Sequence, residues 1–276
     1  RAAKACPEVR NAFFDQCEDL TKQLQSEGKL PKGLEAKNVF HGDEIGFDVR
    51  GKFNKCTFRL KQKGGKRQMR TTGEKSPFWV TCLFFTCADG KFHVPPFVVH
   101  QAGANGGSLA LLEGLRDDFL FMTNPAGYMD KKGFRGILRL MKTKIKVRPA
   151  LIIIDGHHSH MAPDVWVEMI DDGIYVIFIP SHTSGWLGAN DVGPNSKLKA
   201  LVNRFVEDWR ARHPCQQMLP SDWNECVVKA WVVFVNTGEV THAMSQWLES
   251  GLGRRLTSYV WSDSVLGVWL RLCEVV

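Results

Sequence analysis

The stretch that most constrains the fold is residues 151–160, which read Leu-Ile-Ile-Ile-Asp-Gly-His-His-Ser-His. Four consecutive aliphatic side chains, Leu151 to Ile154, show neither a helical nor an alternating period, which is typical of a strand buried on both faces of a sheet. The run ends at Asp155. In open α/β sheets, ligands and reacting groups gather at the carboxyl ends of strands, so Asp155 is a candidate site residue. The alternative is that Asp155 only caps a turn before the next helix.

Composition sets limits on the partners. The 276 residues contain 36 Lys and Arg against 29 Asp and Glu, a net charge of +7, and a sequence pI near 9.0, which permits a polyanionic partner. The eight cysteines form no C-x-x-C pair, and we expect reduced thiols and an intracellular setting. No apolar stretch approaches the ~20 residues that span a bilayer, so we expect no membrane partner.

The hydrophobic pattern predicts an α/β chain. An amphipathic helix from Val9 to Leu24 should end at Gly28, and another helix should cover residues 133–141. Strands are expected at 38–49, 77–87, 92–99, 151–155 and 174–179, with a hairpin turn at Asp89-Gly90. Helices should begin at Pro163 and Pro194, separated by a loop over residues 181–190.

Two further carboxylates are candidates. Asp43 comes just past the apolar residues of the short strand expected within 38–49, and Asp191 lies in the approach to the helix at Pro194. Each has a structural alternative: Asp43 as a turn residue beside Gly42, and Asp191 as a negative charge near a helix N-terminus, worth ~0.5 kcal/mol. If Asp43, Asp155 and Asp191 converge, their mutual repulsion calls for a divalent cation, and carboxylate oxygens suit Mg²⁺ or Mn²⁺ rather than Zn²⁺.

The segment 61–70 is basic, with Lys61, Lys63, Lys66, Arg67 and Arg70 around two glycines. It is either a loop that follows a phosphate backbone or a solvated hairpin tip.

A zinc site from the three histidines after Asp155, His157, His158 and His160, is disfavoured, because three ligands within four residues rarely reach tetrahedral geometry.

Four segments in order resemble the catalytic core of pogo/Tigger-type DDE transposases, which are related to the Tc1/mariner group. They are residues 39–47 around Asp43, the hairpin with Ala88-Asp89-Gly90 and Val94-Pro95-Pro96-Phe97, residues 151–160, and residues 179–199 with Asp191. The resemblance spans residues 8 to 210.

The resemblance implies a fold, a metal pair and a reaction. The fold would be RNase H-like: a mixed five-stranded sheet flanked by helices, with extra helices at the C-terminus. Asp43, Asp155 and Asp191 would be the catalytic and metal-binding triad for two Mg²⁺ or Mn²⁺ ions. His160 matches a position that the family often fills with His, which implies a role in orienting the site or touching the scissile phosphate. Family members cut DNA at transposon ends and join the freed 3′-hydroxyl to target DNA, which implies DNA as the partner, a possible homodimer in a synaptic complex, a nuclear location and no small-molecule substrate.

The expected division is a helical lead-in at 1–36, the catalytic core at 37–212 and a helical extension at 213–276. One departure stands out: relatives commonly have Gln-Pro-Leu before the third acid, where this chain has Leu187-Gly188-Ala189-Asn190. That change leaves open a domesticated, catalytically idle domain that binds DNA or protein. An unrelated RNase H-like exonuclease is the third alternative.

Overall fold

The fold is a mixed sheet between two layers of helices. The computed structural model describes residues 7–30, 35–48, 79–102, 111–180, 183–214, 216, 218–236 and 238; the basic segment 61–70 lies outside them. Six strands are present: β1 (Val39–Asp48), β2 (Trp79–Cys87), β3 (Phe97–Gln101), β4 (Leu120–Asn124), β5 (Ala150–Asp155) and β6 (Ile174–Ile179). The longer helices are α1 (Pro7–Ser26), α2 (Lys131–Lys144), α3 (Pro163–Asp171), α6 (Pro194–Arg212) and α7 (Pro220–Asn236). Among the described residues, no helix is both long enough and apolar enough to cross a membrane.

The strand order is β4-β3-β2-β1-β5-β6. The β1, β2 and β3 strands form an antiparallel meander, whereas β5 and β6 run parallel to β1. These five strands have the expected RNase H-like arrangement. The expected count of five was one short, because β4 adds a sixth strand parallel to β3 at the sheet edge.

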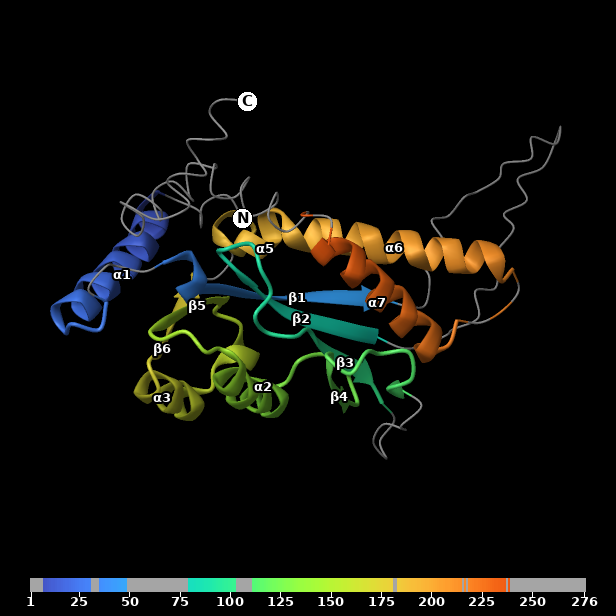
Figure 1. The fold of residues 1–276 in the computed structure, drawn as a ribbon, viewed down its shortest axis with the longest axis horizontal. Helices are drawn as coiled ribbons and strands as arrows, with labels where there is room; N and C mark the ends of the chain where they lie inside the picture. Colours follow the sequence, from blue (N-terminus) through green and yellow to red (C-terminus); the bar gives the residue numbers. More distant parts are fainter. Residues whose placement is uncertain are drawn as a thin grey trace, which may run out of the picture.

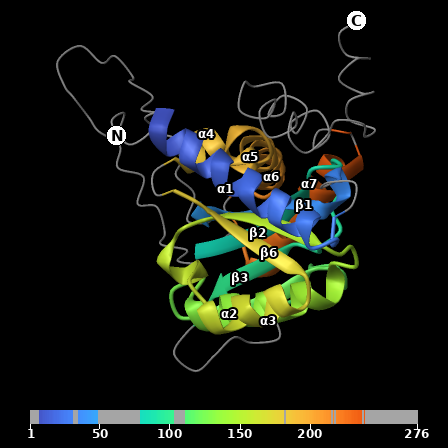
Figure 2. The same ribbon diagram turned by 90° about the vertical axis from the view of Figure 1, so that its left-hand side faces the viewer.

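The two faces of the sheet carry separate hydrophobic cores. Odd-numbered residues of β1 and β5, such as Ile45 and Ile153, join the core under α1, α6 and α7, and even-numbered ones, such as Phe40 and Ile152, join the core over α2 and α3. Figures 1 and 2 show these two helical layers on opposite sides of the sheet. The alternation follows from the strand's two-residue period.

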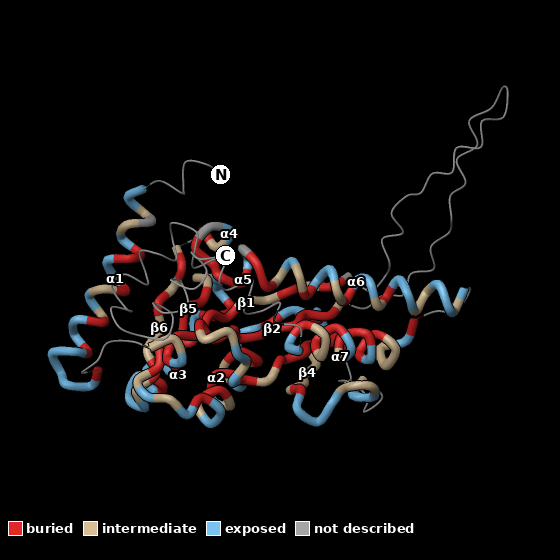
Figure 3. Tube along the Cα trace, turned by 45° about the horizontal axis from the view of Figure 1, so that its top comes forward, coloured by how far each residue is buried: buried red, intermediate tan, exposed pale blue. Residues whose placement is uncertain are grey.

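The helices form where the sequence pattern predicts them. In α2, Gly133, Phe134, Ile137, Leu138 and Met141 are buried on one face, and the Asp130 carboxylate accepts a hydrogen bond from the Gly133 amide at 2.7 Å as the N-cap. The α3 helix begins at Pro163, and Gly173 follows it with φ +76°. Figure 3 shows the outer side of α6 exposed and its inner side buried.

Two details differ from the sequence-based expectations. The strand expected at 92–99 begins only at Phe97. The expected loop over 181–190 contains two single-turn helices, α4 (Ser184–Leu187) and α5 (Ala189–Val192). The α7 helix belongs to the same core as the sheet, since its Trp223 ring lies 5.4 Å from that of Phe47 in β1.

Candidate active site

The pairing of β1 with β5 places two of the candidate carboxylates side by side. In this parallel pair His41 lies beside Ile153. Asp43 and Asp155 each follow two residues later, so both project to the face that α5 and α6 cover. Gly42 is a strand residue here, not part of a turn: a Cβ on it would lie 2.2 Å from the Phe85 ring. The turn interpretation of Asp43 was therefore wrong.

The third carboxylate reaches the same place from a different element. Asp191 lies in α5, and the Asn195 amide one turn later donates to Asp43 Oδ2 at 2.5 Å and to Asp191 Oδ1 at 3.2 Å. The three acids therefore converge around the centre of the sheet. Asp155 and Asp191 both lie near enough to the buried His41 for their charges to act on its imidazole.

The run that departs from the family pattern holds α5 in place. Asn190 is fully buried; its side-chain amide donates to the His41 carbonyl at 3.0 Å, and its main-chain N–H donates to His41 Nδ1 at 3.4 Å. A Cβ at position 188 would lie 2.5 Å from the Ser184 carbonyl, so only glycine fits there. The Leu187-Gly188-Ala189-Asn190 run is thus well packed and fixes Asp191 against β1.

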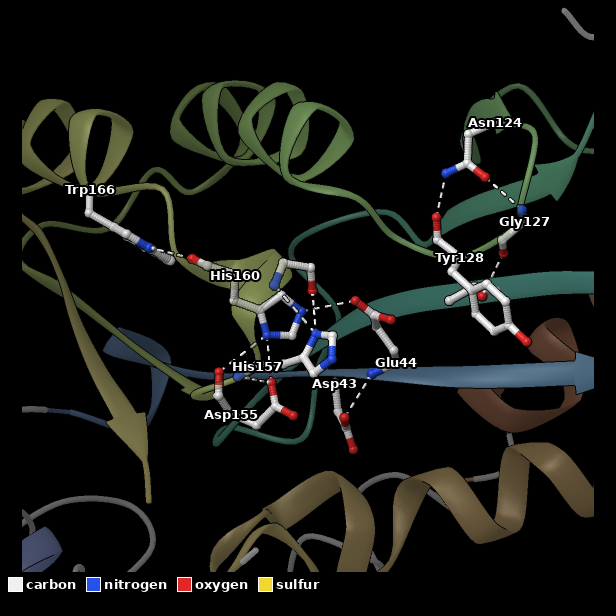
Figure 4. A network of polar contacts seen from close by, with 11 residues as sticks. Asp43, Glu44, Asn124, Gly127, Tyr128, Asp155, His157, His160 and Trp166 are labelled. Carbon is white, nitrogen blue, oxygen red and sulfur yellow. Dashed lines mark hydrogen bonds and ion pairs between the residues drawn. The ribbon is translucent and has the colours of Figure 1, made fainter. Parts of the chain in front are cut away.

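A chain of polar contacts joins two of the acids (Figure 4). The Glu44 amide donates to Asp43 Oδ1 at 2.8 Å, the Glu44 carboxylate lies 2.9 Å from His160 Nε2, and His160 Nδ1 lies 2.5 Å from Asp155 Oδ1. His160 is only 3% exposed. It packs against the Phe134 ring at 4.6 Å, which fixes the imidazole plane.

The pKa values follow from these contacts. Burial raises the pKa of Asp43 well above its usual range, and the charge of Asp191 and a hydrogen bond with it add to the rise. Burial would raise the pKa of Asp155, but the hydrogen bond and charge of His160 outweigh burial and lower it. Burial would lower the pKa of His160, because it disfavours the charged imidazolium, yet the carboxylates of Asp155 and Glu44 raise this pKa to about 9. Burial lowers the pKa of His41 to about 4.

The donor set fits a hard divalent cation. Three carboxylates converge where one of them, Asp43, resists ionisation beside a second negative charge, and a cation would relieve that repulsion. Within the described part of the chain, His41 Nε2, Asn190 Oδ1 and Asn195 Oδ1 are buried beside these acids without a hydrogen-bond partner. Such atoms make the surroundings polar, as an ion requires.

The sequence analysis missed two contributors. Glu44 was noticed only as the neighbour of Asp43, although strand alternation already sends it to the opposite face toward His160. Asn195 was overlooked; its signal was its position four residues after Asp191 on a helical path.

A zinc site at His157 and His158 does not form among the described residues: both are exposed, and His157 Nδ1 contacts Ser159 Oγ at 2.7 Å.

The chain is similar in sequence to part of a much longer curated protein. Over 184 residues the chain is 28% identical to the MFS-type transporter clz9 of Cochliobolus lunatus, covering 64% of this chain and 19% of that protein. The chain thus spans about a fifth of the length of this curated relative.

Solved structures are similar only at a low level. The Mos1 transposase paired-end complex with left transposon end gives a TM-score of 0.42 at 11% identity, covering 94% of this chain and 64% of that chain. The catalytic domain of Mos1 mariner transposase gives 0.34 at 11% identity, covering 85% and 95%.

The match to a protein-family model shows which family this chain belongs to. The model of the DDE superfamily endonuclease matches residues 79–234, more than half of the 276 residues, and this region includes Asp155 and Asp191. The chain therefore belongs to the DDE superfamily endonuclease family.

Proposed function

We propose that this chain is the core of a metal-dependent DNA endonuclease and transposase of the pogo/Tigger type. The observation that carries the proposal is the convergence of Asp43, Asp155 and Asp191 from β1, β5 and α5 in a member of the DDE superfamily endonuclease family. The reaction would cut phosphodiester bonds at transposon ends and join the 3′-hydroxyl ends to target DNA.

In this proposal the three aspartates hold Mg²⁺ or Mn²⁺ through carboxylate oxygens. A pair of such ions, when bound, activates a water or 3′-hydroxyl and stabilises the leaving oxygen. The chain's own residues prepare the site: His160 holds the Asp155 carboxylate and Glu44 holds His160. Asn190 fixes α5 on β1, which sets the position of Asp191.

The remaining parts of the proposal concern partners and organisation. Lys61, Lys63, Lys66, Arg67 and Arg70 would contact the DNA backbone, two copies of the chain would meet in a synaptic complex, and the protein would act in the nucleus. Residues 1–36 would lead into a catalytic core at 37–212, and residues 213–276 would extend it.

A specific observation also favours the idle alternative. All three acids already have partners within the chain: the Asn195 amide contacts Asp43 and Asp191, and the buried His160 contacts Asp155. A domesticated domain that binds DNA or protein without cutting would tolerate this arrangement. An active enzyme would bind the cation through the acceptor positions of these carboxylates that Asn195 and His160 leave open.

Nicking of a supercoiled plasmid in Mg²⁺ or Mn²⁺ tests the proposal. We expect the native chain to nick and Asp155→Asn to lose nicking. The control Asp164→Asn, which changes an exposed acid paired with Arg135 in α3, should retain it. Nicking that persists in Asp155→Asn would refute the proposed site. Plasmid binding without nicking by the native chain would support the idle domain.

A second assay separates transposase from exonuclease. A labelled oligonucleotide with a free 3′-hydroxyl is incubated with target plasmid, and joined product is measured. Joining supports the transposase, whereas degradation from DNA ends without joining supports the unrelated exonuclease.

A further inference from the structure

A group of ligand-forming side chains lies outside the acidic site, at the turn after β2. Cys87 Sγ, a carboxylate oxygen of Asp89 and a ring nitrogen of His93 all lie within 4.8 Å of one another. The carboxylate oxygens of Asp43, Asp155 and Asp191 do not all lie so close to one another, so among the described residues this is the one group of three or more His, Cys, Asp or Glu side chains already at that spacing. It differs from the acidic site in chemistry, because it offers sulfur and nitrogen as well as oxygen.

The backbone holds the three residues in this arrangement without a metal. The β2 strand ends at Cys87, whose amide donates to the Lys91 carbonyl at 3.1 Å, and Gly90 turns the chain with φ +77°. The Asp89 carboxylate accepts from the Lys91 amide at 2.9 Å and contacts His93 Nε2 at 2.8 Å. Val94, directly after His93, is buried and anchors this side of the turn. The turn therefore brings Asp89 to His93, while the Cys87 thiol beside them donates to the Ala36 carbonyl at 3.2 Å, a contact that metal binding would replace.

The three ligand atoms, all within 4.8 Å of one another, lie close enough for a tetrahedral zinc site to form with small side-chain movements. With Zn–S near 2.3 Å and Zn–N and Zn–O near 2.0–2.1 Å, ligand atoms in such a site are roughly 3.3–3.6 Å apart. The 2.8 Å contact between Asp89 and His93 would open by about 0.5 Å to admit the ion, a change within reach of side-chain rotation. Cys87 is buried, while Asp89 and His93 are partly exposed, so the ion has a path from solvent.

We propose that Cys87, Asp89 and His93 form a second metal site, selective for Zn²⁺ and similar thiophilic divalent cations and left open to a water at its fourth position. The thiolate and imidazole favour such cations over Mg²⁺ and Mn²⁺, which prefer oxygen ligands. The bound ion would clamp the end of β2 to the turn that leads toward β3. The inference does not depend on the proposed nuclease function.

The site is separate from the three aspartates. Cys87 pairs with Phe40 of β1, whereas Asp43 pairs with Phe84, three residues along the strand, or about 10 Å. Cys87 also belongs to the core on the α2 and α3 side, and Asp43 projects to the other face. An ion at the aspartates could not contact the Cys87 sulfur.

Cobalt substitution tests this site directly. Co²⁺ bound to a thiolate gives a charge-transfer band in the near ultraviolet, and Co²⁺ on oxygen ligands does not. We expect one equivalent of Co²⁺ to produce this band in the native chain and Zn²⁺ to abolish it by displacement. The band should grow with rising pH, because binding releases the thiol proton.

Variants assign the ligands. Cys87→Ala and His93→Gln should each remove the band, and His93→Gln changes an exposed side chain and leaves the buried Cys87 in place. Cys82→Ala, at a buried cysteine of the same strand on the opposite face, should leave it intact, as should Asp155→Asn. Absence of the band in the native chain, or its survival in Cys87→Ala or His93→Gln, would overturn the proposal.

Discussion

His160 should make the stability of the metal-free protein depend on pH in a defined direction. Both ring nitrogens face carboxylates, at 2.9 Å to Glu44 and 2.5 Å to Asp155, so both must donate and the imidazole is protonated. These contacts raise the pKa of His160 from 6.5 to about 9. At about 1.4 kcal/mol per unit, the stabilisation is about 3 kcal/mol.

The direction of the pH dependence follows from the linkage between proton binding and folding. Because the pKa of His160 is higher in the folded state than in the unfolded state, its contribution is complete below pH 6.5 and is lost as the pH rises through 9. The perturbation is His160→Gln, which keeps a polar side chain but cannot become charged. The variant should be less stable than the native chain below pH 6.5, and this deficit should shrink by about 3 kcal/mol once the pH exceeds 9.

Urea unfolding with a metal chelator measures this difference at both pH extremes. His158→Gln, which changes an exposed neighbour in the same 3₁₀ turn, is the matched control and should show no such change. A deficit for His160→Gln that is equal below pH 6.5 and above pH 9 would refute the argument, because the ion pairs would then contribute nothing that titrates.

Three other perturbations, at a buried histidine, a buried aromatic ring and a helix N-cap, should lower the stability of the fold. Burial lowers the pKa of His100 to about 4, against the effect of its hydrogen bond to Asn224. Lowering the pH from 6.5 toward 4 should therefore reduce the free energy of unfolding by about 3 kcal/mol. The His100→Gln variant should lose this pH dependence in urea unfolding. Phe134→Ala, at a fully buried ring, should cost ~3–5 kcal/mol in the same assay. Asp130→Ala should remove the α2 N-cap and cost ~1 kcal/mol, seen as a lower thermal midpoint.

The elements with strong local patterns could be predicted from the sequence. The aliphatic run ending at Asp155 is β5, and the 3.6-residue period of residues 133–141 marks the buried face of α2. The β4 strand was missed, because its five residues depend on pairing with β3 more than on their own pattern. Long-range pairing of this kind leaves little trace in a single sequence.

The acidic residues of the candidate site could be predicted from the sequence, but the residues that hold them in place through hydrogen bonds could not. Asp43 and Asp155 follow apolar runs of adjacent strands, and the family pattern points to both. The hydrogen bonds of Asn190 to His41 and of Asn195 to Asp43 join residues about 150 positions apart. The Cys87 group was not predicted, because its Cys-x-Asp-x₃-His spacing matches no common metal-binding pattern and its members come together only where Gly90 turns the chain.

Titration of the native chain with Mn²⁺, followed by calorimetry, tests the central claim most directly. We expect the native chain to bind Mn²⁺ and binding to be lost in Asp43→Asn and in Asp191→Asn, because each substitution removes a carboxylate from the converging set. Asp89→Asn, an acid at the separate Cys87 turn, should leave Mn²⁺ binding unchanged. Equal Mn²⁺ binding by the native chain and both site variants, or no binding by the native chain, would contradict a metal centre at Asp43, Asp155 and Asp191.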